Sequence, residues 1–220
     1  PNPPHKSVPI GNDSSNNKVV KIWGEKPKFD FKPKNHIEIA TTNNLINFVA
    51  GSKISGSGFP LYTDQGARLE RCLINFMIDV HTKEHLYKEI YVPLIVNSDS
   101  LTGTGQLPKF KEDQFKIDDS EQDLYLIPTA EVPVTNYHRN EIIELEELPL
   151  SYVCHTPCLR SEAGSYGKDT RGIMRLHQFE KVELVQAVEA SDSEEALEEL
   201  TSHAESILKN LELPYRVVSL

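Results

Sequence analysis

The chain has 220 residues, with 23 lysines and arginines against 33 aspartates and glutamates, which gives a formal net charge of −10 at pH 7. This length is enough for one domain with a substantial core. The charged share of 25% is ordinary, so composition excludes a wholly disordered chain, and no apolar run approaches the roughly 18 residues that cross a bilayer. The net negative charge argues against a protein that holds nucleic acid by bulk electrostatics.

Residues 1–35 have the composition of a linker or arm, because they contain several prolines and a polar run. One short strand is predicted within them, at Val19–Trp23. A folded core begins near residue 36. The clearest helix covers 66–84 and leads into a short strand, Glu89–Val92. Apolar residues at helical spacing predict one buried stripe on this helix: Leu69, Cys72, Leu73, Phe76, Met77 and Val80.

A second helix is predicted at 192–210 by the same spacing. Its expected buried face is Leu197, Leu200, Ala204, Ile207, Leu208 and Leu211. Further strands are predicted at Leu124–Ile127, Ser151–Glu162, His177–Glu189 and Tyr215–Ser219. Several strands in long runs, with helices between only some of them, predict an α+β fold with an antiparallel sheet.

The cysteines indicate a reducing compartment, because three thiols in a chain of this length do not form a disulfide framework. Cys154 and Cys158 bracket a histidine, which leaves a zinc site open. No second cysteine pair completes the usual four ligands, so we interpret both as buried thiols and predict no metal site.

Two predicted strands flank a glycine-rich segment and carry an unusually polar set of residues. Because strand side chains alternate, each strand presents its polar residues on one face. The first strand offers Arg160 and Glu162; the second offers Phe179, Lys181 and Glu183, with Arg175 if the strand starts early. Arginines, a ring and carboxylates together suit a ligand with a carboxylate or phosphate and an aromatic base. A solvated face held by cross-strand ion pairs explains the same pattern.

Six short sequence motifs favour the ligand-binding interpretation over the solvated face. They are CLRSEAGS at 158–165, KDTRG at 168–172, HQFEKVE at 177–183, Thr129-Ala130-Glu131, GARLER at 66–71 and TGQLPKF at 104–110. In these motifs the chain resembles the seryl-tRNA synthetase family of class II aminoacyl-tRNA synthetases. Residues 158–183 correspond to motif 2, and the helix from 66 with the strand before Pro93 corresponds to motif 1.

The resemblance implies an α+β catalytic core, an antiparallel sheet flanked by helices, that is incomplete in this chain. Residues 1–35 would be the linker from an N-terminal tRNA-binding arm. Residues 36–220 would be a partial catalytic domain with motifs 1 and 2, and motif 3 would follow Leu220. A chain of these residues alone is therefore expected to be inactive.

Residue roles follow from motif position alone. The catalytic residues would be Arg160, Glu162 and Arg175. Serine would contact Thr129, Ala130, Glu131, Arg160 and Glu183. ATP would contact Arg160, Ser161, Glu162, Arg175, Leu176 and Phe179. Lys168 and Arg171 would approach the acceptor end of tRNA.

The implied activity is that of a cytoplasmic, homodimeric serine–tRNA ligase that dimerises through motif 1. It would activate serine with ATP and Mg²⁺ to seryl-adenylate and transfer it to tRNA(Ser), and also to tRNA(Sec). Two alternatives stay open. A relative of the same fold could load an amino acid onto a carrier protein, or a non-catalytic paralogue could retain the fold as a binding module.

Overall fold

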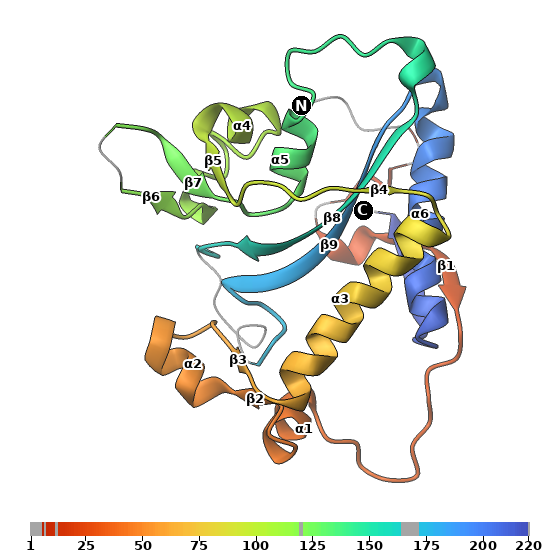
Figure 1. Cartoon of the computed structure of the whole chain (residues 1–220). Coiled ribbons are helices and arrows are strands. Elements are labelled where there is room, and N and C mark those ends of the chain that lie inside the picture. Colours follow the sequence, from red (N-terminus) through yellow and green to blue (C-terminus); the bar gives the residue numbers. More distant parts are fainter. Residues whose placement is uncertain (1–5, 7, 12, 119–120, 164–171, 220) are drawn as a thin grey trace. The chain divides into compact units, whose positions relative to one another are not determined.

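The computed structural model describes residues 6, 8–11, 13–118, 121–163 and 172–219. The chain divides into two compact units, drawn in Figure 1. We call residues 1–33 with 199–220 the first unit and residues 34–198 the second unit. In the described residues, no helix is long and apolar enough to cross a membrane.

The first unit is built on a two-stranded antiparallel sheet. Strand β1 (Lys18–Trp23) pairs with β10 (Tyr215–Ser219), which confirms both predicted strands, and a 3-10 turn at Ser14–Asn16 precedes β1. The rings of Trp23 and Tyr215 stack with centroids 5.6 Å apart. The segment expected to be a linker therefore holds a strand that is paired with a distant part of the chain.

Helix α6 (Ser193–Asn210) confirms the predicted helix but only part of its buried face. Ile207 is buried, whereas Leu197 is 62% exposed and the neighbouring Leu211 is 37% exposed. Glu205, a charged residue, is buried instead, because Lys21 of β1 donates to its carboxylate at 2.6 Å. This partner holds the pKa of Glu205 below its usual value.

The second unit contains the sheet that carries the predicted hairpin. Its order is β4 (Lys88–Glu89), β8 (Leu150–Leu159) and β9 (Gln178–Ala187), with β8 and β9 antiparallel and β4 parallel to β8. Both long strands are shorter than predicted, so Arg160 and Glu162 lie just beyond β8 and Arg175 lies before β9. Figure 1 shows helix α3 on one side of β8 and β9, and α5 on the other.

A second three-stranded sheet lies in the same unit, with the order β5 (Ile95–Asn97), β7 (Leu124–Leu126) and β6 (Lys116–Ile117), all antiparallel. Short helices follow two of its strands: α4 (Ser98–Gly103) and α5 (Glu131–Asn136). Two buried clusters hold these parts together. One joins Val96, Leu101, Tyr125, Ile127 and Val132; the other joins Val92, Ala130, Val134, Tyr152 and Cys154. The α+β class is thus as predicted.

The remaining elements surround the start of α3. They are α1 (His36–Thr42), β2 (Ile46–Asn47), α2 (Phe48–Ser55) and β3 (Leu61–Tyr62), and β2 pairs with β3. Two 3-10 turns lie elsewhere in the unit, at Lys111–Asp113 and Leu145–Glu147. Gly66, in the first turn of α3, is needed for close packing, because a Cβ there would lie 2.0 Å from the Leu45 carbonyl oxygen.

Helix α3 (Gln65–Lys83) confirms the predicted helix but corrects its expected buried stripe. Val80 is buried, while Leu69 is 54% exposed and Cys72 is also exposed. Helical periodicity identifies which face of a helix is apolar, but it does not say what covers that face. Near the start of α3 the described part of this chain leaves the stripe open.

Candidate active site

A cavity of about 340 Å³ lies within the second unit. Its lining residues are Gln106, Phe110, Asp113, Gln114, Pro128, Thr129, Glu131, Arg160, Glu162, Arg175 and Lys181. Five of these were assigned to ligands from the sequence: Thr129, Glu131, Arg160, Glu162 and Arg175. The structure therefore brings together residues from the segment before α5 and from both flanks of the β8–β9 connection.

Arg160 is fixed at the end of β8 through its main chain and its side chain. Its N–H donates to the His177 carbonyl at 2.9 Å, and its Nε donates to the Pro128 carbonyl at 3.1 Å. The guanidinium carbon lies 5.2 Å from the centroid of the Phe179 ring. Because the Pro128 bond uses Nε, the two terminal nitrogens take no part in it and can serve a carboxylate or phosphate.

Glu162 and Arg175 meet across the hairpin connection. Arg175 Nε donates to Glu162 Oε2, although neither residue lies in a strand. Glu162 has a φ of 50°, in the left-handed region that non-glycine residues seldom adopt. The glutamate side chain is 13% exposed and that of Arg175 is 52% exposed, so the pair forms at the cavity rim with the arginine outermost.

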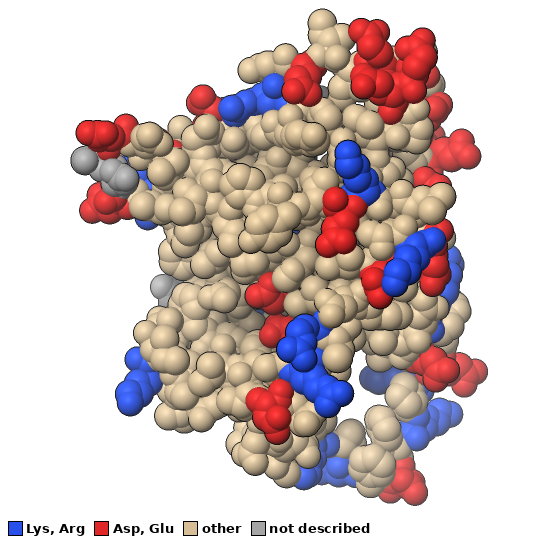
Figure 2. Space-filling view, in the orientation of Figure 1, with Lys and Arg blue, Asp and Glu red and all other residues tan. Residues whose placement is uncertain are grey.

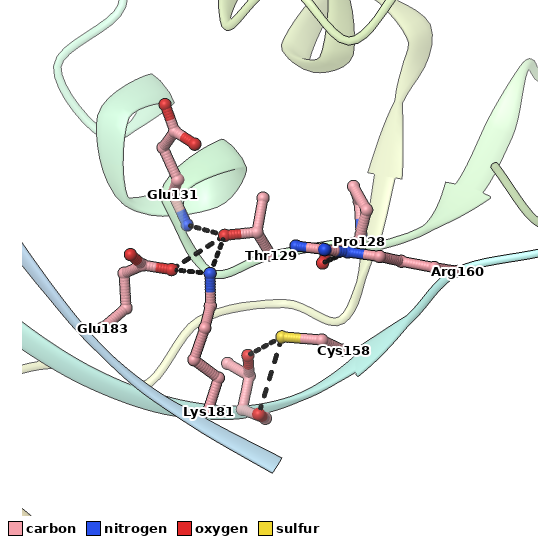
Figure 3. A network of polar contacts seen from close by, with 8 residues as sticks. Pro128, Thr129, Glu131, Cys158, Arg160, Lys181 and Glu183 are labelled. Atoms are coloured by element: carbon pink, nitrogen blue, oxygen red, sulfur yellow. Dashed lines mark hydrogen bonds and ion pairs between the residues drawn. The ribbon is translucent and has the colours of Figure 1, made fainter. Parts of the chain in front are cut away.

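Thr129 is the centre of a polar network, drawn in Figure 3. Its hydroxyl donates to Glu183 Oε2 at 2.8 Å and accepts from Lys181 Nζ at 2.7 Å. It also accepts from the Glu131 N–H at 3.2 Å. Lys181 completes the network with an ion pair to Glu183.

Lys181 is a member of the network to which the sequence pattern assigns no role. Strand alternation places Lys181 on the same face of the strand as Phe179 and Glu183. Its contact with Thr129, however, joins residues that are 52 positions apart. Glu131 contributes its main chain to the network, while Figure 3 shows its carboxylate directed away from Thr129. No pattern in the sequence indicates the contact between Lys181 and Thr129.

Three predicted ligand contacts have side chains directed elsewhere. Ala130 is fully buried and Leu176 is 7% exposed. The Ser161 hydroxyl donates to the Glu112 carbonyl, and its N–H donates to the Asp113 carbonyl at 2.9 Å. Any ligand contact of Ala130 or Leu176 would therefore fall to the main chain. Lys168 and Arg171, predicted to approach tRNA, lie outside the described residues.

Two buried thiols lie on β8 under this face. Cys154 and Cys158 are 1% and 0% exposed, as the buried-thiol interpretation predicts. Burial raises the pKa of both thiols, that of Cys154 to about 11, and the nearby Glu183 charge acts on Cys154 in the same direction. Both thiols are therefore protonated at neutral pH and serve as packing groups.

Comparisons with known proteins agree with this geometry. Residues 110–220 match the family described as tRNA synthetase class II core domain (G, H, P, S and T). The chain is 59% identical over 220 residues to a serine–tRNA ligase of Syntrophobacter fumaroxidans, and 58% identical over 218 residues to one of Alkaliphilus oremlandii. These alignments cover 100% and 99% of this chain but 52% and 51% of the relatives. The chain thus spans about half the length of the curated relatives it matches.

Solved structures give the same result. A crystal structure of seryl-tRNA synthetase from Pyrococcus horikoshii complexed with ATP superposes with a TM-score of 0.94 at 35% identity, over 99% of this chain and 53% of that one. A serine–tRNA ligase from Naegleria fowleri in complex with AMP gives 0.91 at 31% identity, over 97% and 51%. Since the family match covers just over half of its residues, the chain belongs to the class II tRNA synthetase core-domain family.

Proposed function

We propose that this chain is part of the catalytic region of a serine–tRNA ligase. One observation carries the proposal: a single cavity is lined by Arg160, by the Glu162–Arg175 pair and by Thr129 with its partners Glu131 and Lys181. Such a cavity offers a donor fork for carboxylate or phosphate and a carboxylate-lined corner for an ammonium group. The names of relatives at 54–59% identity over the whole chain support serine as the amino acid.

The reaction needs no protein nucleophile. A serine carboxylate oxygen would attack the α-phosphorus of ATP, the bond to pyrophosphate would break, and seryl-adenylate would form. A hydroxyl at the 3′ end of tRNA would then attack the serine carbonyl and release AMP. The protein would contribute by holding the two reactants in line and by placing arginine donors where negative charge develops.

The described side chains divide between the two substrates. Arg160 would hold the serine carboxylate and the α-phosphate, and Phe179 would stack on adenine, with Glu162 at the adenine amino group. Thr129, Glu131 and Glu183 would surround the ammonium and hydroxyl of serine. A site that hydrogen-bonds the serine hydroxyl should reject alanine strongly, because alanine would leave that hydrogen-bonding position without a partner.

Magnesium would accompany ATP. In the part of the chain that the structure describes, no group of three or more His, Cys, Asp or Glu side chains could hold a metal ion. We assign the ion mainly to phosphate oxygens, the usual mode for Mg²⁺ with nucleotides. The ion would neutralise phosphate charge during the reaction.

The partners extend beyond this chain. We assign Lys168 and Arg171 to the tRNA acceptor end, with tRNA(Ser) and also tRNA(Sec) as acceptors. Contacts with tRNA that involve a few local cations are compatible with the net charge of −10. Figure 2 shows lysines and arginines interspersed with acidic side chains on the face it draws. The exposed start of the α3 stripe supports a homodimer through motif 1, and free thiols suit the cytoplasm.

We also propose that residues 1–35 are the linker from a tRNA-binding arm and that residues 36–220 are a partial catalytic domain. A strand within the linker, β1, pairs with β10. The middle of the linker would therefore be fixed by strand pairing, and the arm would lie on the N-terminal side of this strand.

The test uses a protein of the relatives' full length that contains this chain. We expect ATP–pyrophosphate exchange with serine, weak exchange with alanine or threonine, and charging of tRNA(Ser). Charging of a carrier protein in place of tRNA would favour the carrier-protein alternative, and absence of any exchange would favour the non-catalytic paralogue. The 220-residue chain alone is expected to show no exchange.

A further inference from the structure

The amine of Lys181 stands in the corner of the cavity that would receive a substrate amine. It lies 2.7 Å from Thr129 Oγ1 and forms an ion pair with Glu183 Oε2. Both acceptors belong to the set that the proposed function assigns to serine. A lysine ammonium and the ammonium of an amino acid carry the same charge and three donor hydrogens each.

The hydrogen-bonding capacity of Thr129 is fully used in this arrangement. A hydroxyl offers one donor and two acceptor positions. Thr129 donates to Glu183, and it accepts from Lys181 and from the Glu131 N–H. No position is left on this oxygen for a second ammonium group.

One of the three partners must therefore leave before Thr129 can bind a ligand amine. Glu131 bonds through its main chain at the start of α5, and Glu183 accepts from both other members. Lys181 has a long flexible side chain, 30% exposed and lining the cavity, so it can move without a change in the backbone.

We propose that Lys181 is a built-in competitor for the amine subsite and that substrate binds by displacing it from Thr129 and Glu183. The inference rests on the proposed function and adds a specificity-determining residue to it. A ligand without an ammonium group has nothing to exchange for the lysine and leaves the network closed. An amino acid replaces one ammonium by another, so the charge of Glu183 stays paired throughout.

The competition lowers the apparent affinity for serine by the fraction of molecules in which the subsite is open. Lys181→Met keeps much of the side-chain length and removes the amine. In the full-length protein we expect it to tighten equilibrium binding of serine by about threefold to tenfold. The dissociation constant of ATP should stay within about twofold, since Lys181 bonds to the amine corner alone.

Methylammonium gives a second readout that a purely structural role would not produce. In Lys181→Met this small amine should fill the vacated corner and weaken serine binding, with KCl at equal ionic strength as the reference. In the wild type it should have little effect, because the lysine already occupies the corner. Lys116→Met is the matched control, because its amine pairs with Asp123 and does not line the cavity.

Weaker or unchanged serine binding by Lys181→Met would overturn the inference, and so would equal methylammonium effects in both proteins. Lys181→Gln, which keeps a donor for Thr129 without the charge, is the second variant. It should also bind serine more tightly than the wild type, and looser binding counts against the inference. If the wild type itself neither binds nor activates serine, the proposed function fails instead.

Discussion

The guanidinium carbon of Arg160 lies 5.2 Å from the centroid of the Phe179 ring. Because Phe179 is opposite Cys158 in the β8–β9 register, the arginine reaches across from the end of one strand to the face of the next. The same side chain also donates to the Pro128 carbonyl, next to Thr129. Arg160 thus connects the residues assigned to the base with those assigned to the amino acid.

Arg160→Lys tests this connection. Lysine keeps the charge but cannot hold the Pro128 carbonyl and present a donor fork at the same time. We expect serine-dependent exchange at saturating substrates to fall by about 100-fold, as for a lost transition-state donor. Arg139→Lys is the control, because the Arg139 guanidinium contacts the Ser100 hydroxyl at 3.4 Å and does not line the cavity. Equal loss in both variants would contradict the role given to Arg160.

Glu183→Gln should damage serine recognition selectively. The KM for serine should rise by about tenfold or more, since a charged hydrogen-bond partner of the ammonium is lost, while the KM for ATP changes little. Glu180→Gln provides the comparison on the same strand, because Glu180 pairs with His155 at 2.8 Å, whereas Glu183 accepts from Thr129. A collapse of ATP affinity with intact serine dependence would show that Glu183 has another role.

The two long helices and the long strands of the fold were predictable, because hydrophobic spacing and strand alternation are local properties of the sequence. The short helices α1, α2, α4 and α5 were not predicted. The exposure of Leu69 on α3 and the burial of Glu205 could not be predicted, because each depends on whether a distant segment of the chain covers the side chain. The site followed the same division. Strand alternation grouped Arg160, Glu162 and Glu183, and family resemblance added Thr129, whereas the Lys181–Thr129 contact exists only once the chain is folded.

Leu69→Asp tests the open end of the α3 stripe. Leu69 is 54% exposed, so the change should leave folding of the chain nearly intact, within about 0.5 kcal/mol. If this face is the dimer contact, the buried charge should shift the full-length protein from dimer to monomer in sedimentation or light scattering. Asn75→Asp, which adds the same charge at another exposed position of α3, should leave the mass unchanged. A dimeric Leu69→Asp protein would rule out this contact.

The thiols should react unequally. Cys72 is exposed and should be modified rapidly by a thiol reagent, whereas Cys154 and Cys158 should react only after unfolding. The folded pKa of Cys154 is raised from 9.0 to about 11, so the stability that this neutral thiol contributes is present below pH 9 and is lost between pH 9 and 11. Cys154→Ala should flatten this part of the stability profile, and an unchanged profile would contradict the assignment.

Lys21→Met should destabilise the first unit in a pH-dependent way. The folded pKa of Glu205 is lowered, chiefly by the hydrogen bond from Lys21, so the pair stabilises the fold above the unfolded value of 4.5 and loses this effect as pH falls. Trp23, the only tryptophan, stacks on Tyr215 and reports on this unit by fluorescence. The denaturant midpoint should drop at pH 7 and converge with the wild type in acid. Lys18→Met should show no such pH dependence.

The pairing of β1 with β10 has a consequence for synthesis of the protein. Lys21 and Glu205 are 184 positions apart, and a ribosome adding about 5–20 residues per second needs roughly 10–40 seconds to cover that interval. During this time β1 has no partner strand, although Val19, Val20 and Ile22 give it an apolar character. Lys18 precedes these residues and Lys21 interrupts them, and their positive charges discourage pairing with strands of other nascent chains. We therefore expect the lysine that later binds Glu205 also to reduce aggregation of the unfinished chain.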